Sequence, residues 1–307
     1  MYHYVRPPSS DGNYYYLDLS DFRRQLDYFE SNYGFLDRES FVEAIRTGTD
    51  PGNDIVLTFD DGLRDHFDWV YPELRKRGLW GIFYVPTGPY ETGSVLDVHR
   101  IHGLLGQFLG SEVLDELKDI VTSDMIPDQR RQDFRTYTYE SQDNTEATTK
   151  VKRILNYYIS YEHRSSVLNT LENRLSGSTR DVPDVYASLS QFEEMQNNGM
   201  IIGSHSVTHR VFSKLDRTEQ KREIFDSFSL LGSAFGRLDL RTFCYPYGGD
   251  HTYDDTTLSL LSDADCEFAF SVESRDVTDD DLTNFRNELP RYDCNEFPHG
   301  EASGGVV

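Results

Sequence analysis

Residues 55–67 read IVLTFDDGLRDHF. Apolar, β-favouring residues lead into two adjacent aspartates, Asp60 and Asp61, and then into a glycine. This pattern predicts a buried strand that ends on two carboxylates. Two like charges so close raise the cost of ionising each other, and a strand end solvates both poorly. We therefore expect a positive charge from elsewhere in the chain to compensate them.

Short apolar or aromatic runs alternate with amphipathic helical segments along the chain, which is the pattern of a β/α architecture. In the helical segment 18–34, for example, Phe22, Leu26 and Phe29 recur on one face. The pattern predicts an α/β fold, a barrel of about seven strands. The expected strands are residues 1–5, 54–60, 81–87, 200–205, 242–248, 267–273 and 288–293.

One long segment interrupts this alternation. Residues 88–187 contain several helical patterns and no convincing strand. We interpret the chain, 1–307, as a single domain with a helical insertion at about 88–187. The last residues, from about 298, are expected to form a loose tail.

The composition limits the partners of the protein. The net charge is −23, with 24 Arg but only 6 Lys, which disfavours nucleic acids and anionic membranes. An acidic, lysine-poor surface favours a halophilic protein, the alternative being an ordinary acidic one. No stretch is long enough for a transmembrane segment, and no secretory signal is evident, so we expect a cytoplasmic protein. The three cysteines are interpreted as reduced thiols.

A second stretch, IIGSHSVTHRVFSKL at 201–215, supplies two histidines directly after an expected strand. If a helical turn begins there, His205 and His209 point the same way from successive turns. Two neutral imidazoles and one carboxylate, that of Asp61, would form a facial site for one divalent metal ion. Zinc is the favoured ion, and cobalt, nickel or iron would also suit these ligands. Such a cation would let Asp60 stay ionised beside Asp61.

Each motif alone has a simpler interpretation. Two aspartates before a glycine often form only a turn that caps a helix, and a His-x-x-x-His pair is commonly a surface pair. Their joint occurrence at strand ends of a β/α chain favours a metal site.

Three motifs together resemble the polysaccharide deacetylase family, the carbohydrate esterases with a NodB-like distorted β/α barrel. They are LTFDDG (57–62), GSHSVTH (203–209) and FCYPYG (243–248). The resemblance spans roughly residues 1–87 and 200–293. It implies that Asp60 is the general base and that Asp61, His205 and His209 are the metal ligands. It also implies that the backbone N–H of Tyr247 helps to hold the oxyanion.

The chain departs from the family pattern in two places. Many members carry an arginine where this sequence has Cys244, and we predict that Arg291 replaces it in orienting the base. An ordinary ion pair is the alternative role for Arg291. No late leucine-x-histidine motif supplies a general acid. The opening MYHYV resembles members with circularly rearranged motifs, which makes His3 the predicted acid; a structural role for His3 stays open, and His102 is a second candidate.

Three functions follow from these residues. The first is metal-dependent removal of an N-acetyl group from an amino sugar, in an intracellular glycan or surface-polysaccharide precursor. The second is hydrolysis of a non-sugar amide, such as a ureide or cyclic imide, for which the altered third motif leaves room. The third is a catalytically inactive, carbohydrate-binding barrel, which the presence of both aspartates and both histidines disfavours. The oligomeric state stays open.

Overall fold

The computed structural model describes residues 1–8, 14–49, 51–133, 138–139, 144–176 and 182–304. The chain divides into two compact units. The first consists of Met1–Pro8, Tyr16–Gly93 and Tyr186–Ser303, and the second consists mainly of Ser94–Val185.

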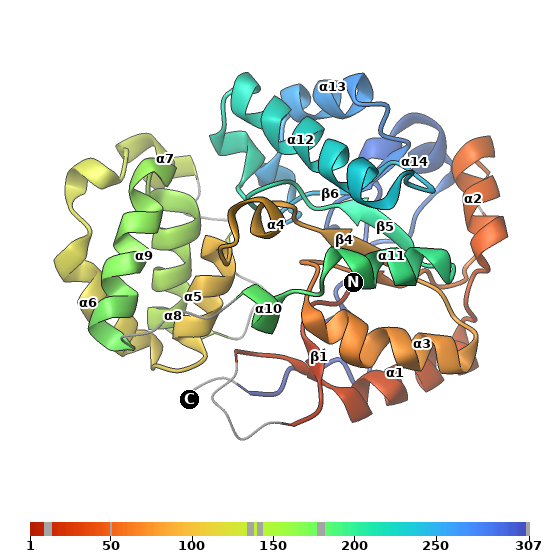
Figure 1. The fold of residues 1–307 in the computed structure, drawn as a ribbon, viewed down its shortest axis with the longest axis horizontal. Helices are drawn as coiled ribbons and strands as arrows, with labels where there is room; N and C mark the ends of the chain where they lie inside the picture. Colours follow the sequence, from red (N-terminus) through yellow and green to blue (C-terminus); the bar gives the residue numbers. More distant parts are fainter. Residues whose placement is uncertain (9–13, 50, 134–137, 140–143, 177–181, 305–307) are drawn as a thin grey trace. The chain divides into compact units, whose positions relative to one another are not determined.

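The first unit is built on a five-stranded parallel sheet with the strand order β3-β4-β5-β6-β7 (Figure 1). All of its strand residues are buried, as expected for a parallel sheet covered on both faces. The strands are β3 Thr58–Phe59, β4 Ile82–Val85, β5 Ile201–Ser204, β6 Thr242–Cys244 and β7 Phe268–Phe270.

The two remaining expected strand segments flank this sheet. Tyr2 forms a bridge with Phe59 at one edge, and Leu289 forms a bridge with Phe270 at the other. The ammonium group of Met1 donates to the carbonyl of Tyr292 at 2.7 Å, so the two flanking segments also meet each other. The five strands and the two flanking segments follow one another in chain order, which confirms the predicted distorted α/β fold. Of the seven expected strands, however, only five pair as strands of the main sheet, and the first and last contribute single bridges. A separate pair, β1 Val5–Arg6 and β2 Leu17–Asp18, forms a small parallel sheet.

Helices of the first unit connect successive strands and cover the sheet. Helix α12, which follows β5, begins at a capping box in which Asp216 and Glu219 satisfy each other's backbone N–H groups. It packs against α13, as Figure 1 shows. The helices are α1 Leu19–Asn32, α2 Arg38–Thr47, η1 His66–Val70, α3 Tyr71–Arg77, α4 Gly88–Thr92, α11 Leu189–Asn197, η4 Phe212–Lys214, α12 Arg217–Phe235, η5 Asp250–Thr252, α13 Asp255–Asp263, α14 Asp279–Asn284, η6 Arg286–Glu288 and η7 Cys294–Glu296.

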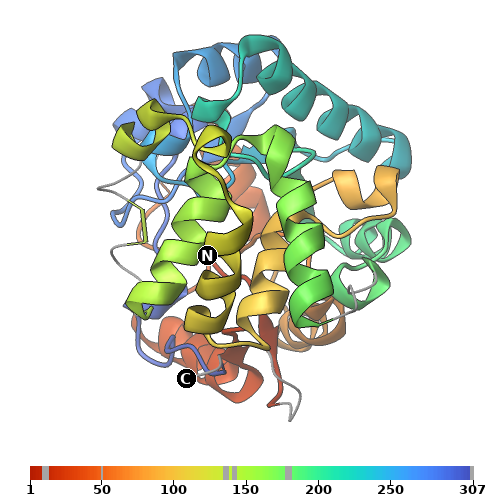
Figure 2. The same ribbon diagram turned by 90° about the vertical axis from the view of Figure 1, so that its left-hand side faces the viewer.

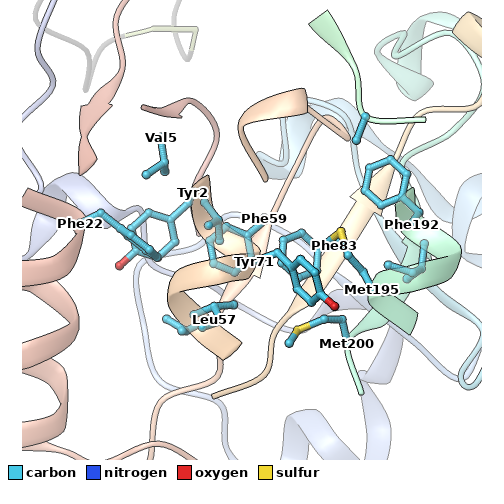
Figure 3. Close-up of a cluster of buried hydrophobic side chains, with 14 of the residues drawn as sticks. Tyr2, Val5, Phe22, Leu57, Phe59, Tyr71, Phe83, Phe192, Met195 and Met200 are labelled. Carbon is cyan, nitrogen blue, oxygen red and sulfur yellow. The ribbon is translucent and has the colours of Figure 1, made fainter. Parts of the chain in front are cut away.

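An aromatic cluster holds β3 in place just before the two aspartates (Figure 3). The ring of Phe59 stacks on Phe83 of β4 at 4.6 Å and on Tyr2 of the N-terminal segment at 5.3 Å. Phe22 of α1 meets the ring of Tyr2 edge-on. Burying each such ring contributes about 2–3 kcal/mol, so the end of β3 is a rigid position.

In the second unit, the described residues form helices around a core of their own (Figure 2). Val113, Leu117, Val151 and Leu168 are among the buried residues of this core. Across the described chain, every helix is too short or too polar to cross a membrane. The helices of this unit are α5 Asp97–Leu105, α6 Gly110–Ile120, η2 Ser123–Met125, α7 Asp128–Asp133, α8 Glu146–Lys152, η3 Arg153–Tyr158, α9 Tyr161–Leu175 and α10 Val182–Val185.

Candidate functional site

Asp60 and Asp61 follow β3 directly, and both are buried. Successive residues at a strand end point to opposite sides, and the chain then turns sharply, because Asp61 has a φ of 79° and Gly62 a φ of 62°. As a result the two carboxylates contact different partners. Asp60 meets Arg291, and Asp61 lies beside two histidines.

Arg291 is the positive charge that compensates Asp60. Its Nη1 and Nη2 donate to the two carboxylate oxygens at 2.9 Å each, and both side chains are buried. Burial favours the neutral form of Asp60, but the charge and hydrogen bonds of Arg291 outweigh it and hold the pKa of Asp60 well below its ordinary value. The carboxylate is therefore ionised at neutral pH, as a general base requires.

Further contacts orient the guanidinium of Arg291. Nε donates to the carbonyl of Ser271 at 3.1 Å, and Nη1 also donates to Oγ1 of Thr58 at 3.0 Å. Nη2 lies 2.9 Å from Sγ of Cys244, and the Cys244 thiol reaches the Asp60 carboxylate at 3.4 Å. The sequence analysis did not predict that Cys244 would contact Asp60 and Arg291, or that Thr58 would accept a hydrogen bond from Arg291. The contact of Thr58 could have been anticipated, because side chains alternate along a strand and Thr58, two residues before Asp60, points to the same side.

His205 and His209 converge on Asp61. The Nε2 atoms of His205 and His209 lie 3.4 Å and 3.2 Å from Oδ1 of Asp61. The expected helical turn is wrong: the residues after β5 form an irregular loop, in which Ser206 and His209 have φ values of 66° and 54°. The imidazoles meet because this loop bends, whereas the prediction rested on successive helical turns.

The tautomer of His205 suits a ligand. Its Nδ1 lies 2.8 Å from the carbonyl oxygen of Cys244, and since a carbonyl only accepts, Nδ1 must be the donor. A neutral His205 then presents the lone pair of Nε2 towards Asp61, which is how a backbone partner orients a metal-binding imidazole.

The donor set fits a divalent metal ion. One carboxylate oxygen and two imidazole nitrogens, from Asp61, His205 and His209, all lie within 4.8 Å of one another and belong to buried residues. Imidazole and carboxylate ligands with room for further oxygen ligands suit zinc, iron, cobalt or nickel. A second group, Asp60, His205 and Cys244, meets the same distance criterion, but Asp60 and Cys244 already bind Arg291.

Tyr247 follows β6 and has a φ of 66°. Its ring meets the ring of His209 edge-on, with the centroids 4.9 Å apart. The structure thus brings the third motif to the same edge of the sheet as the two histidines, while the oxyanion role of the Tyr247 N–H stays a prediction.

The two candidate general acids lie in different units. His3 is half-buried in the N-terminal segment, and its carbonyl accepts a hydrogen bond from Nε2 of His66 at 2.9 Å. His102 belongs to the second unit, where its ring stacks on Tyr14 at 4.0 Å. Within the first unit, the N–H of Asp60 donates to the carbonyl of Tyr2, the neighbour of His3, at 2.9 Å, so His3 lies near the predicted base.

The sequence matches one protein-family model. A family model described as polysaccharide deacetylase matches residues 162–269, a stretch that contains His205, His209 and Tyr247. No curated protein sequence matches the chain.

Several solved structures share the fold. The Streptococcus pyogenes deacetylase PplD in complex with acetate is 18% identical, with a TM-score of 0.57 over 95% of this chain and 89% of that chain. A de-N-acetylase from Aggregatibacter actinomycetemcomitans is 13% identical, with a TM-score of 0.53 over 95% and 92%. The BpsB deacetylase domain from Bordetella bronchiseptica is 13% identical, with a TM-score of 0.50 over 95% and 94%. The family match covers two of the three motifs on which the resemblance to the polysaccharide deacetylase family rests, and the solved structures show a shared fold.

Proposed function

We propose that this protein is a metal-dependent hydrolase that removes the N-acetyl group from an amino sugar in a glycan or glycan precursor. One observation carries the proposal: an ionised Asp60 held by Arg291 lies beside the converging ligands Asp61, His205 and His209. The family match and the deacetylase names of the structural neighbours support it.

A metal ion, when bound by Asp61, His205 and His209, would supply Lewis acidity toward water and toward the acetamide carbonyl. Asp60 would accept the proton of the attacking water as general base. Arg291 would keep that carboxylate charged and would hold both of its oxygens in one orientation. Because Asp60 is buried, its proton transfer takes place where few competing waters reach it.

The carbonyl oxygen becomes negative as water attacks, and the backbone N–H of Tyr247 would donate to it. An amine leaves poorly unless it gains a proton, so a general acid is needed. We assign this role to His3, because the carbonyl of its neighbour Tyr2 accepts a hydrogen bond from the N–H of Asp60 at 2.9 Å and because His3 is only half-buried. The hydrogen bond from His66 to the His3 carbonyl would steady that part of the backbone.

Hydrolysis of candidate amides tests the substrate class. Acetate release from oligosaccharides of N-acetylglucosamine would be compared with the appearance of the carboxylate product from a ureide and from a cyclic imide, before and after treatment with a chelator. We expect turnover of the sugars only, and its loss after chelation. Asp60→Asn should lower the rate by about 10²–10⁴-fold, whereas Asp226→Asn, at an exposed position, should not. Faster turnover of the ureide or imide would contradict the sugar assignment, and full activity in Asp60→Asn would refute the base.

Elemental analysis tests the metal site without a substrate. We expect about one metal ion per chain in the wild type and loss of that ion in His209→Asn. Asparagine is a suitable replacement because it tolerates the left-handed backbone found at His209. Absence of metal in the wild type, even after addition of zinc, would refute the hydrolase mechanism.

A further inference from the structure

The loop 205–209, which carries both histidines, has no regular secondary structure, yet each of its backbone N–H groups has a partner. The N–H of His205 donates to the carbonyl of Val85 at 3.0 Å, which continues the pairing of β5 with β4. The N–H of His209 donates to Oγ of Ser206 at 3.0 Å. The three N–H groups between them, those of Ser206, Val207 and Thr208, also donate to side chains. The N–H groups of Val207 and Thr208 share one acceptor, a residue of α12.

That residue is Glu223, which is buried. Its Oε2 accepts from the backbone N–H of Val207 at 2.8 Å and from that of Thr208 at 2.7 Å. Its Oε1 accepts from the hydroxyl of Thr208. A carboxylate is well suited here, because hydrogen bonds to a charged acceptor are about twice as strong as those between neutral groups.

A second contact joins the same helix to the start of the loop. The N–H of Ser206 donates to Oγ of Ser204 at 3.2 Å. Oγ of Ser204 lies 2.6 Å from Oγ of Ser227, which in turn donates to the carbonyl of Ile224 at 2.8 Å. Ser227 lies four residues after Glu223 and therefore on the same face of α12.

The loop needs such support, because Ser206 and His209 are left-handed, a conformation that is unfavourable for residues other than glycine. We propose that Glu223 and Ser227 are positioning residues, which hold the loop in the conformation that directs His205 and His209 at Asp61. The inference rests on the proposed function, in which these histidines bind the metal. A loop that samples other conformations binds metal more weakly, because the apparent dissociation constant rises in inverse proportion to the fraction of time that the loop holds the binding conformation.

Two readouts test this role on the purified protein: amide hydrogen exchange of residues 206–209 in the metal-free state, and titration with Co²⁺, whose visible spectrum reports the ligand geometry. Glu223→Asp keeps the charge but withdraws the carboxylate by about 1.5 Å, so we expect faster loop exchange and at least about tenfold weaker Co²⁺ binding. Glu223→Gln keeps an oxygen that can accept both backbone N–H groups but loses the charge, so its Co²⁺ affinity should fall by only about threefold, less than that of Glu223→Asp.

Asp226→Asn, on the exposed face of the same helix, is the matched control and should change neither readout. If Glu223→Asp fails to fold, Ser227→Ala provides the same test, with faster exchange at Ser206. Wild-type exchange and affinity in every folded variant would overturn the inference, and so would a loss in Glu223→Gln equal to that in Glu223→Asp. A wild type that binds no Co²⁺ would refute the proposed function instead, while hydrogen exchange would still decide whether Glu223 and Ser227 hold the loop.

Discussion

Replacing Arg291 with methionine should destabilise the protein by about 3–5 kcal/mol, because it leaves the buried charge of Asp60 without its partner. The guanidinium makes two hydrogen bonds to Asp60 and one each to Thr58 and to the carbonyl of Ser271. Domains are typically stable by about 5–15 kcal/mol, so this loss is a large fraction of the total. Arg291→Lys should lose less, since it keeps the charge but not the two-pronged geometry.

Urea unfolding at pH 7 in the presence of a chelator measures this effect apart from metal binding. The pKa of Asp60 is held below its ordinary value, so the pair contributes fully above about pH 4 and loses its contribution only as the pH falls below that. The double variant Asp60→Asn with Arg291→Met should recover about 2–3 kcal/mol relative to the sum of the single losses. A loss below about 1 kcal/mol for Arg291→Met, or strictly additive single losses, would refute this account of the pair.

Three further outcomes are expected. A Cβ at Gly203 would lie 2.5 Å from Cε1 of Tyr84, so Gly203→Ala should cost about 1–3 kcal/mol in urea unfolding; wild-type stability would show that Tyr84 can move. Burial lowers the pKa of Lys152 to about 7, so above that pH the unfolded chain binds more protons than the folded one. The free energy of unfolding should therefore rise from pH 7 to about 10, and Lys152→Met should abolish this rise. His3→Gln should slow amide hydrolysis by about 10²-fold but barely affect an aryl acetate, whose leaving group needs no proton; equal losses on both substrates would exclude His3 as the acid.

The fold could be predicted because the strand segments are short, apolar and separated by amphipathic helices. Segments such as 81–87 and 200–205 contain β4 and β5, where both faces of the sheet are buried and the sequence is almost continuously apolar. Asp60 and Asp61 could be recognised as site residues because they are charged, whereas the strand before them is apolar. Charged residues at the end of a buried strand require a compensating charge. The structure supplies that compensation to Asp60 through Arg291.

The geometry of the histidine loop could not be predicted in the same way. A spacing of four residues fits a helical turn, and only the structure shows that His205 and His209 meet through a bent, left-handed loop. Glu223, which is distant in sequence, binds that loop because α12 packs against β5. The thiol of Cys244 likewise lies beside Asp60 although β6 and β3 are not neighbours in the sheet, so no local pattern could predict this contact.

Backbone conformation explains why local rules fail at this site. Among the described residues, seven non-glycine residues have a positive φ, and four of them are Asp61, Ser206, His209 and Tyr247. Each costs about 1 kcal/mol relative to an ordinary conformation, so local preference opposes the turns that bring these residues together. The turns persist because long-range hydrogen bonds, such as those of Glu223, hold them. Local propensity therefore predicts the strands at whose ends the site residues lie, but not the turns that bring their side chains together. Backbone strain confined to such turns is expected where the chemistry requires side chains to converge.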